Sequence, residues 1–270
     1  MNHVRRRRST HYQTGSNRFN DFLPEFHFLA FLLKSYFLCL PSFATQGKFF
    51  DNDVDVFSGL NKRYIGEVLS TVYEKLGRPR SLVFKHCGFC RMVPFLLKEF
   101  PDWKHIVILR DPRDVLASEM RGYMRARSAS SVPEHVVENV ISQYNDCYSR
   151  VLSTDKSDGR VFGVRFENIV QEEFSALESF VGDKLHPDRL WASTLFDINT
   201  YEKTNAYSHE WGRPLTSETV GSYRKTINEE VASVILSKTA QTVASFDARF
   251  CNSTEKVTTC LGTFHSGVNL

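Results

Sequence analysis

The sequence lacks the features that would place it at once in several common classes of protein. Its net charge of +3 over 270 residues is too small to indicate a nucleic-acid partner. Six cysteines are too few for a disulfide-stabilised scaffold. No second cysteine pair follows Cys87 and Cys90 at a spacing typical of zinc sites. No internal repeat is visible. We therefore expect neither a nucleic-acid partner nor a metal site.

What the sequence does have is the composition of an ordinary globular protein. Hydrophobic residues make up 41% of the chain and charged residues 24%, so a buried core is expected. Four arginines, Arg5–Arg8, are typical of a disordered tail, a membrane-flanking charge or a sorting signal. We expect a basic tail over residues 1–9, a single domain over 10–250 and a loose C-terminal tail over 251–270.

One long apolar stretch, Phe26–Ala44, raises the question of a membrane anchor. Its length suits a membrane span, and the arginine run precedes it, as in a signal anchor. Against this, Lys34 stands at mid-segment, where a charge is costly, and Pro41 lies near its end. We favour a buried core helix and a cytoplasmic protein. The alternative is a membrane anchor in the Golgi.

From residue 61 onward, segments with helical periodicity alternate with short apolar runs typical of strands. Such alternation indicates right-handed βαβ units and a mostly parallel sheet. The predicted fold class is therefore α/β, with a central sheet flanked by helices. The expected helices are 63–76, 92–100, 112–125, 133–152, 172–181 and one that starts near 228. The expected strands are 81–85, 105–110 and 160–166. The second of these strands is apolar enough to be buried on both faces.

The most informative segment is the run I-V-I-L-R-D-P-R-D-V-L-A-S at residues 106–118. In a parallel sheet, ligands bind beyond the carboxyl ends of the strands, and Arg110 lies at such an end. Asp111 is placed to cap the following helix, with Pro112 as its first residue. Ser118 falls in the second turn of that helix. A guanidinium and a hydroxyl beside a helix start are well suited to bind a phosphate group.

This run resembles the motif with which sulfotransferases bind the 3′-phosphate of their donor, 3′-phosphoadenosine 5′-phosphosulfate (PAPS). In that motif an arginine at a strand end and a serine eight residues later hold the phosphate. The resemblance implies that Arg110 and Ser118 take these roles in this chain. It also implies a P-loop-type α/β architecture and a transfer reaction that requires no metal.

A second segment, S-L-V-F-K-H at residues 81–86, resembles the family strand that ends in lysine and histidine. The resemblance implies that His86 is the general base for an acceptor hydroxyl, a role that suits the near-neutral pKa of histidine. Lys85 would neutralise charge on the transferred sulfuryl group. The family often has one more residue between the two, and a purely structural histidine is the alternative.

Two segments further along the chain also resemble family elements. Residues 166–170 resemble a Y-E-D-L turn in which an aromatic ring approaches the adenine, with Phe166 at the tyrosine position but without a hydroxyl. Residues 221–225 resemble a late G-x-W-R element, which implies that Arg224 and Lys225 reach the 3′-phosphate. The alternatives are a core phenylalanine and an exposed basic turn.

The family binds the 5′-phosphosulfate in a glycine-containing loop, and the candidate for it is residues 10–19. A glycine permits the tight turn, and a serine with nearby backbone N–H groups is suited to cradle the group. Gln13 stands where the family has a cation that stabilises the leaving oxygen, and Arg18 is a substitute. A plain N-terminal turn is the alternative. The candidate ligands in the loop are Thr14, Gly15, Ser16 and Asn17.

Together these segments predict a sulfotransferase that moves a sulfuryl group from PAPS to a hydroxyl or amine of a small molecule or carbohydrate. The alternative is a catalytically degenerate protein that binds the nucleotide but lacks the loop cation. A nucleoside or sugar kinase is excluded because the sequence has no G-x-x-x-x-G-K-[ST] loop. Residues 201–214 are rich in Tyr, His and Trp and either line the acceptor pocket or form a surface loop.

Overall fold

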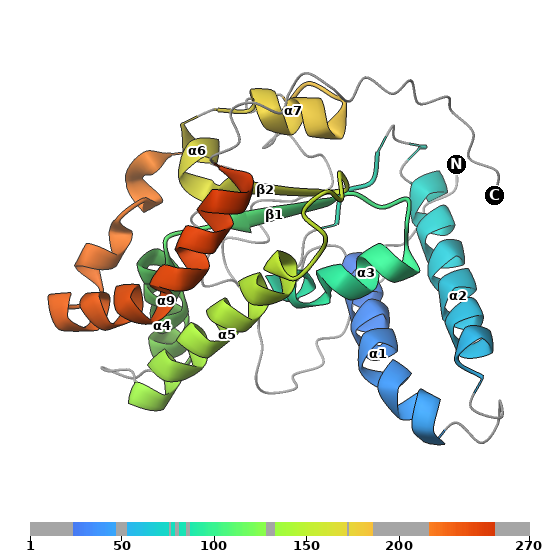
Figure 1. The fold of residues 1–270 in the computed structure, drawn as a ribbon, viewed down its shortest axis with the longest axis horizontal. Coiled ribbons are helices and arrows are strands. Elements are labelled where there is room, and N and C mark those ends of the chain that lie inside the picture. The colour runs from blue at the N-terminus through green and yellow to red at the C-terminus, as the bar shows by residue number, and fades with distance from the viewer. Residues whose placement is uncertain are drawn as a thin grey trace, which may run out of the picture.

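The structure is a computed structural model that describes residues 24–46, 53–75, 77–78, 81–84, 87–127, 133–171, 173–185 and 216–251. Helices predominate, and two short strands lie among them (Figure 1). In chain order the elements are α1 (Pro24–Gln46), α2 (Val54–Lys75), η2 (Cys87–Met92), α3 (Val93–Glu99), β1 (His105–Leu109), α4 (Pro112–Arg127), α5 (Glu134–Leu152), β2 (Val161–Arg165), α6 (Phe166–Val170), α7 (Ser175–Val181), η5 (Ser217–Thr219), η6 (Ser222–Lys225) and α9 (Glu229–Phe250). The η elements are 3-10 helices.

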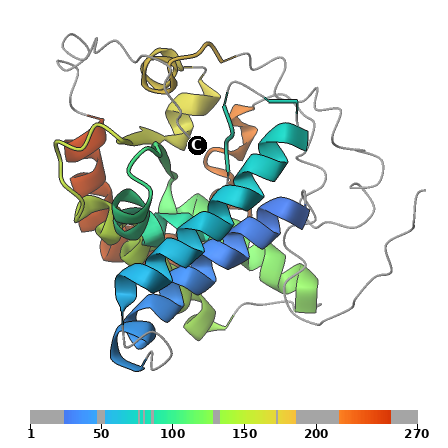
Figure 2. The same cartoon turned by 90° about the vertical axis from the view of Figure 1, so that its right-hand side faces the viewer.

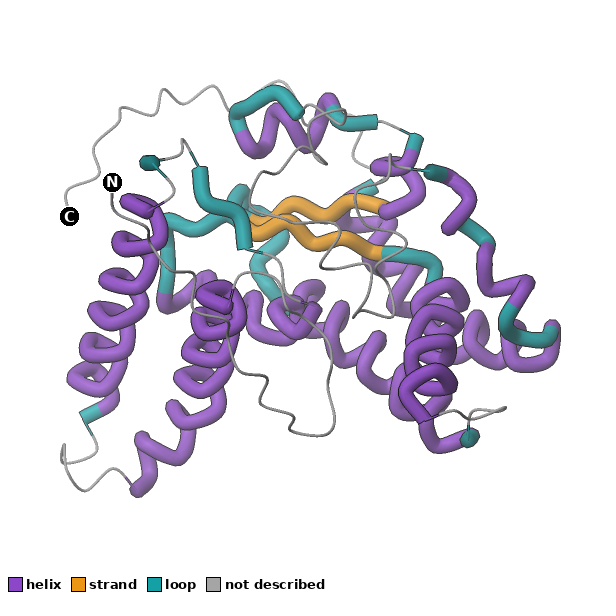
Figure 3. Tube along the Cα trace, turned by 180° about the vertical axis from the view of Figure 1, so that it is seen from behind, coloured by secondary structure: helices purple, strands orange, loops and turns teal. Residues whose placement is uncertain are grey.

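The two strands pair in parallel, as the alternation of elements predicted. His105 lies opposite Val161 and Leu109 lies opposite Arg165, and the chain crosses between the strands through α4 and α5. Figure 3 shows α1 and α2 toward one end of the pair and α4 and α9 toward the other. The α/β class is therefore confirmed, although the sheet has only two strands within the part of the chain that the structure describes.

The predicted strand at 81–85 is wrong over its described residues, 81–84, which form no strand. This short apolar run is only partly covered. Phe84 stacks on Trp103, with ring centroids 6.3 Å apart, while Val83 is 71% exposed. An apolar run of this length does not distinguish a strand from a loop that is held by an aromatic contact.

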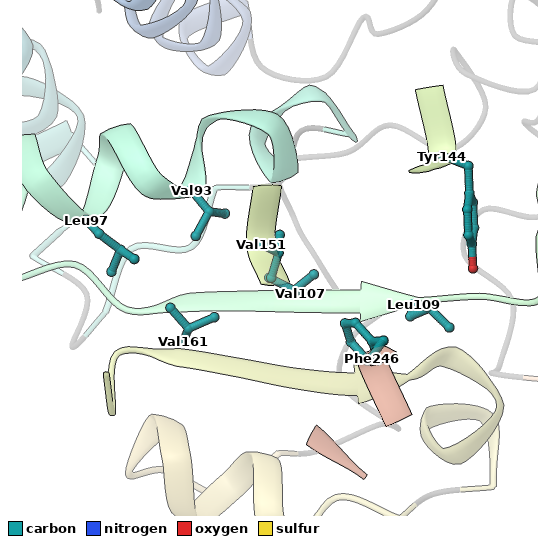
Figure 4. Close-up of a cluster of buried hydrophobic side chains, with 8 residues drawn as sticks. All are labelled: Val93, Leu97, Val107, Leu109, Tyr144, Val151, Val161 and Phe246. Atoms are coloured by element: carbon teal, nitrogen blue, oxygen red, sulfur yellow. The ribbon is translucent and has the colours of Figure 1, made fainter. Parts of the chain in front are cut away.

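The prediction that β1 is buried on both faces is also wrong. Val107 and Leu109 are buried, whereas Ile106 and Ile108 are 38% and 46% exposed. The cause is the placement of the described helices, because α3, α5 and α9 all cover the face that carries Val107 and Leu109 (Figure 4). Among the described residues, burial along β1 thus alternates with the pleat of the strand.

One hydrophobic cluster fills the space between the strands and these helices. Figure 4 shows its buried side chains, which are Val93, Leu97, Val107, Leu109, Tyr144, Val151, Val161 and Phe246. Gly163 of β2 allows α9 to approach the sheet closely. A Cβ at this position would lie 2.3 Å from a Phe250 ring atom and 2.8 Å from a Phe246 ring atom.

A second cluster joins α4 to the C-terminal part of the chain. Its buried members are Leu116, Ala117, Ile141, Tyr223, Ile227, Ala232 and Ile235. These residues belong to α4, α5, η6 and α9 and to the connection before α9. The cluster therefore holds η6 against α4, although more than 90 residues separate the two in sequence.

The long apolar stretch near the N-terminus forms α1, which lies side by side with α2 (Figure 2). One face of α1 buries Leu29, Leu33 and Tyr36, whereas Phe31 on another face is exposed. The predicted packing of this helix into a core is thus confirmed for one face. Within the described residues, no helix combines the length and the apolar character needed to cross a membrane.

A buried polar network joins α1, α2 and α3. Oε2 of Glu99 accepts hydrogen bonds from the hydroxyl groups of Tyr36, at 2.5 Å, and Ser58, at 2.7 Å. Nζ of Lys62 lies 3.1 Å from the same oxygen. Burial by itself would raise the pKa of Glu99, but these hydrogen bonds and the Lys62 charge outweigh burial and lower the pKa. The carboxylate is therefore ionised and satisfied inside the protein.

Several helix ends agree with the local sequence signals. The Asn228 side chain accepts a hydrogen bond from the N–H of Val231 at the start of α9. Gly182 ends α7 in the left-handed region, with φ of 74°. Cys90 and Cys147 form a disulfide, with Cα atoms 5.3 Å apart, which ties η2 to α5. The cysteine spacing did not predict that pair.

We expect Gly163→Ala to destabilise the fold, because the new methyl group would overlap the Phe246 and Phe250 rings. The free energy of unfolding in urea should fall by about 1–3 kcal/mol. Gly159→Ala is the matched control, since a Cβ there meets nothing within 4 Å. Equal stability of the two variants would contradict the packing described here.

We also expect His105 to make the fold less stable as the pH falls from 7 to 5. Burial, assisted by the Arg160 charge, lowers the pKa of His105 to about 4. The unfolded chain therefore takes up a proton near pH 6.5, whereas the folded chain stays neutral until about pH 4. At pH 5 the resulting loss should be about 1–2 kcal/mol.

Urea unfolding at pH 7 and pH 5 measures this loss, with His105→Leu as the comparison. The variant should lose less stability between the two pH values than the native protein. The same pH sensitivity in both proteins would show that other groups are responsible.

Candidate functional site

The candidate site lies where the two parallel strands end. Arg110 directly follows β1 and Phe166 directly follows β2, and the strand register places these two positions next to each other. The Arg110 guanidinium lies over the Phe166 ring, 4.6 Å from the ring centroid. A cation at this distance from an aromatic face is attracted to it. Two residues predicted to bind the cofactor from separate motifs are therefore in contact.

The start of α4 is built as the sequence predicted. Oδ1 of Asp111 accepts a hydrogen bond from the N–H of Arg113 at 2.8 Å and so caps the helix that begins at Pro112. The Arg113 guanidinium also pairs with both oxygens of this carboxylate. Burial would raise the pKa of Asp111, but the hydrogen bonds and charge of Arg113 outweigh burial and lower it. Ser118 is half-buried in the second turn of the same helix.

Three hydrogen bonds hold the backbone at the strand ends. The Tyr144 hydroxyl donates to the carbonyl oxygen of Arg110 at 3.0 Å, and the Tyr148 hydroxyl donates to that of Ile108 at 2.8 Å. Oε1 of Glu167 accepts from the N–H of Asp111 at 3.0 Å. Helix α5 and the segment after β2 thus fix the position from which the Arg110 side chain projects.

The segment 216–225 reaches the same end of the sheet. Nη2 of Arg110 donates to the carbonyl oxygen of Thr219 at 2.7 Å. The Asp114 carboxylate accepts from the N–H groups of Gly221 and Tyr223 at 2.7 and 2.9 Å. The exposed basic residue Arg224 lies in η6, which follows directly. This basic turn is therefore anchored on the phosphate-binding motif that the sequence predicted.

The comparisons with known proteins bear on this arrangement. The family model described as the sulfotransferase family matches residues 41–182, which is more than half of the chain. The chain belongs to the sulfotransferase family. No curated protein and no solved structure matches it. The matched stretch contains both strands, α4 and the residues at the two strand ends, whereas the turn at 216–225 lies outside it.

The structure brings together some of the predicted site residues and leaves others unplaced. Arg110 contacts Phe166, and the turn that carries Arg224 and Lys225 is docked beside them. Ser118 lies on the adjoining helix. The remaining candidates lie outside the described residues, and these are Thr14, Gly15, Ser16, Asn17, Lys85 and His86.

Several residues that shape the site carry no local sequence signal of that role. Asp114 stands three residues after the helix cap, so its position indicates only a helix start. Its partners lie 107 or more residues further along the chain. Glu167 and Tyr144 likewise act on distant backbone groups. Among the described residues, no three His, Cys, Asp or Glu side chains gather closely enough to hold a metal ion.

Proposed function

We propose that this sulfotransferase uses PAPS as its donor and binds the 3′-phosphate of PAPS at the carboxyl end of β1. The observation that supports the proposal most is the convergence of three segments resembling cofactor-binding elements of the family. Arg110 contacts the Phe166 ring, and it donates to Thr219 just before the turn that carries Arg224. Segments separated by more than 50 residues meet at the edge of the sheet where ligands bind in α/β folds.

The described residues fit an anionic ligand. The site contains the cations Arg110, Arg224 and Lys225, and it adjoins the N-terminus of α4, which carries partial positive charge. Three acidic side chains lie near this end of the sheet. Asp111 pairs with Arg113, and Asp114 accepts backbone N–H groups. Glu167 accepts from the N–H of Asp111 through Oε1, while its buried Oε2 has no hydrogen-bond partner among the described residues. Phe166 supplies an apolar ring for the adenine and cannot donate the hydrogen bond of the tyrosine found in the family.

The residues proposed for the transfer step are those that the sequence predicts. PAPS supplies an activated sulfuryl group, whose sulfur–oxygen bond to the 5′-phosphate breaks as a new bond to the acceptor oxygen forms. His86 would take the proton of the acceptor hydroxyl, and Lys85 would balance charge on the moving group. Residues Thr14–Asn17 would hold the 5′-phosphosulfate. The proposal extends to a P-loop-type fold over residues 10–250, with a small molecule or carbohydrate as acceptor.

The Cys90–Cys147 pair supports a proposal for the compartment. Disulfides persist in oxidising compartments and are rare in the cytoplasm. The Cys90–Cys147 disulfide therefore favours the Golgi alternative over the cytoplasmic location that the sequence suggested. This preference concerns the compartment alone and does not depend on whether the chain carries an anchor.

Calorimetric titration with 3′,5′-adenosine bisphosphate, the product of PAPS, tests the cofactor site. We expect Arg110→Ala to weaken binding about 10- to 100-fold, since a hydrogen bond to a charged group is worth about 1.5–3 kcal/mol. Arg150→Ala is the matched control, because Arg150 pairs with Asp146 on the surface of α5. Absence of binding by folded native protein, or equal binding by both variants, would refute the proposed site.

A separate experiment distinguishes an active enzyme from a degenerate one. If Gln13 leaves the phosphosulfate loop without its cation, Gln13→Lys should raise the rate of sulfuryl transfer by about 100-fold. The rate is measured as release of 3′,5′-adenosine bisphosphate from PAPS with a phenol, a primary alcohol or an amino sugar as acceptor. Equal turnover by native and variant protein would show that the native loop needs no cation at this position.

A further inference from the structure

The Asp114 carboxylate is fully buried and all three of its hydrogen-bond donors come from one distant turn. Oδ2 accepts from the N–H of Gly221 at 2.7 Å. Oδ1 accepts from the N–H of Tyr223 at 2.9 Å and from the hydroxyl of Ser222 at 3.3 Å. Burying a charge is costly unless hydrogen bonds replace its water shell. Here a single turn of the backbone supplies them, so the carboxylate and the turn depend on each other.

The location of Asp114 in α4 makes this arrangement favourable. It is the third residue of a helix that begins at Pro112, where a negative charge is stabilised by the helix dipole. An acidic residue three positions after the cap often bonds back to the N–H of the capping residue. In this chain Glu167 accepts from the N–H of Asp111. Asp114 is thereby available to bind the turn at 221–223.

The turn in its bound form sets the direction of the basic side chain that follows it. Gly221 has φ of 73°, a left-handed conformation that glycine adopts readily. The Arg224 guanidinium folds back against this glycine, because a Cβ there would lie 2.4 Å from Nη1 of Arg224. The guanidinium groups of Arg113 and Arg224 also lie over the Tyr223 ring, 4.2 and 4.8 Å from its centroid. The position of the Arg224 side chain therefore depends on Gly221 and Tyr223, whose backbone N–H groups are bound by Asp114.

We propose that Asp114 is a positioning residue that docks the turn at 221–225 so that Arg224 and Lys225 act together with Arg110 on one phosphate group. The inference rests on the proposed function, because it assigns the 3′-phosphate to this combined site. It adds that the acidic residue inside the phosphate-binding motif serves the C-terminal turn and does not touch the ligand.

The test is Asp114→Asn, which keeps the size of the side chain but replaces one acceptor by an N–H₂ donor. Binding of 3′,5′-adenosine bisphosphate should weaken about tenfold or more, the effect of losing roughly one charge-assisted hydrogen bond. Binding of 5′-adenosine monophosphate, which lacks the 3′-phosphate, should change much less. Both affinities are measured by calorimetry on the full chain, and the selective loss is the signature of positioning.

Asp158→Asn is the control, since Asp158 likewise accepts from a backbone N–H, in its case together with the Arg160 guanidinium, and lies before β2, away from the site. It should leave both affinities unchanged. If Asp114→Asn does not fold, Gly221→Ala perturbs the same turn from the other side, because φ of 73° strains an alanine. It should produce the same selective loss.

The outcomes separate this inference from the proposed function. Native protein that binds no 3′,5′-adenosine bisphosphate refutes the proposed function, and the inference falls with it. Native binding with an Asp114→Asn variant that retains full affinity refutes the inference alone. An equal loss of affinity for both nucleotides also refutes it, because a merely structural role would weaken the two ligands alike.

Discussion

The parallel pairing of β1 with β2 is the constraint on which the site depends. Because Leu109 lies opposite Arg165, the next residue of each strand, Arg110 and Phe166, emerges at the same edge. A slip of one residue would turn the side chains of one strand to the other face and separate the guanidinium from the ring. The register is held by the buried cluster on α3, α5 and α9 and by the Arg165–Asp247 ion pair between β2 and α9.

A second principle is the separation of roles among the charged residues of one short motif. In R-D-P-R-D, Asp111 caps α4 and neutralises Arg113, while Asp114 is saturated by donors from the turn at 221–223. The acidic groups thus contribute to folding, and their charges are balanced within the protein. Arg110 projects at the strand end, where its guanidinium lies over the Phe166 ring and donates to Thr219. The two arginines and two aspartates of this motif balance in formal charge, but they make different contacts in the structure.

What the sequence could predict depended on how far apart the interacting groups are. The cap at Asp111 follows from residues within a few positions of each other, and this prediction is confirmed. The Asn228 cap and the left-handed Gly182 are equally local features of the structure. The contacts of Asp114 and the disulfide of Cys147 join groups at least 57 positions apart. No local pattern specifies such contacts. The expected strand at 81–85 is wrong over residues 81–84, where Phe84 stacks on Trp103 and Val83 is exposed, because a short apolar run does not distinguish a strand from a loop.

The residues proposed to bind the 3′-phosphate and the residues proposed to transfer the sulfuryl group lie in different parts of the chain. The 3′-phosphate half of the proposed site is built from described residues at the ends of β1 and β2, and most of it lies within the family match. The transfer half, as proposed, depends on residues 14–17 and on position 13, where Gln13 stands in place of the cation found in the family. Binding energy that is the same in the ground state and the transition state raises affinity without accelerating the reaction. A sulfotransferase can therefore retain Arg110 and its supporting contacts whether or not the loop supports catalysis.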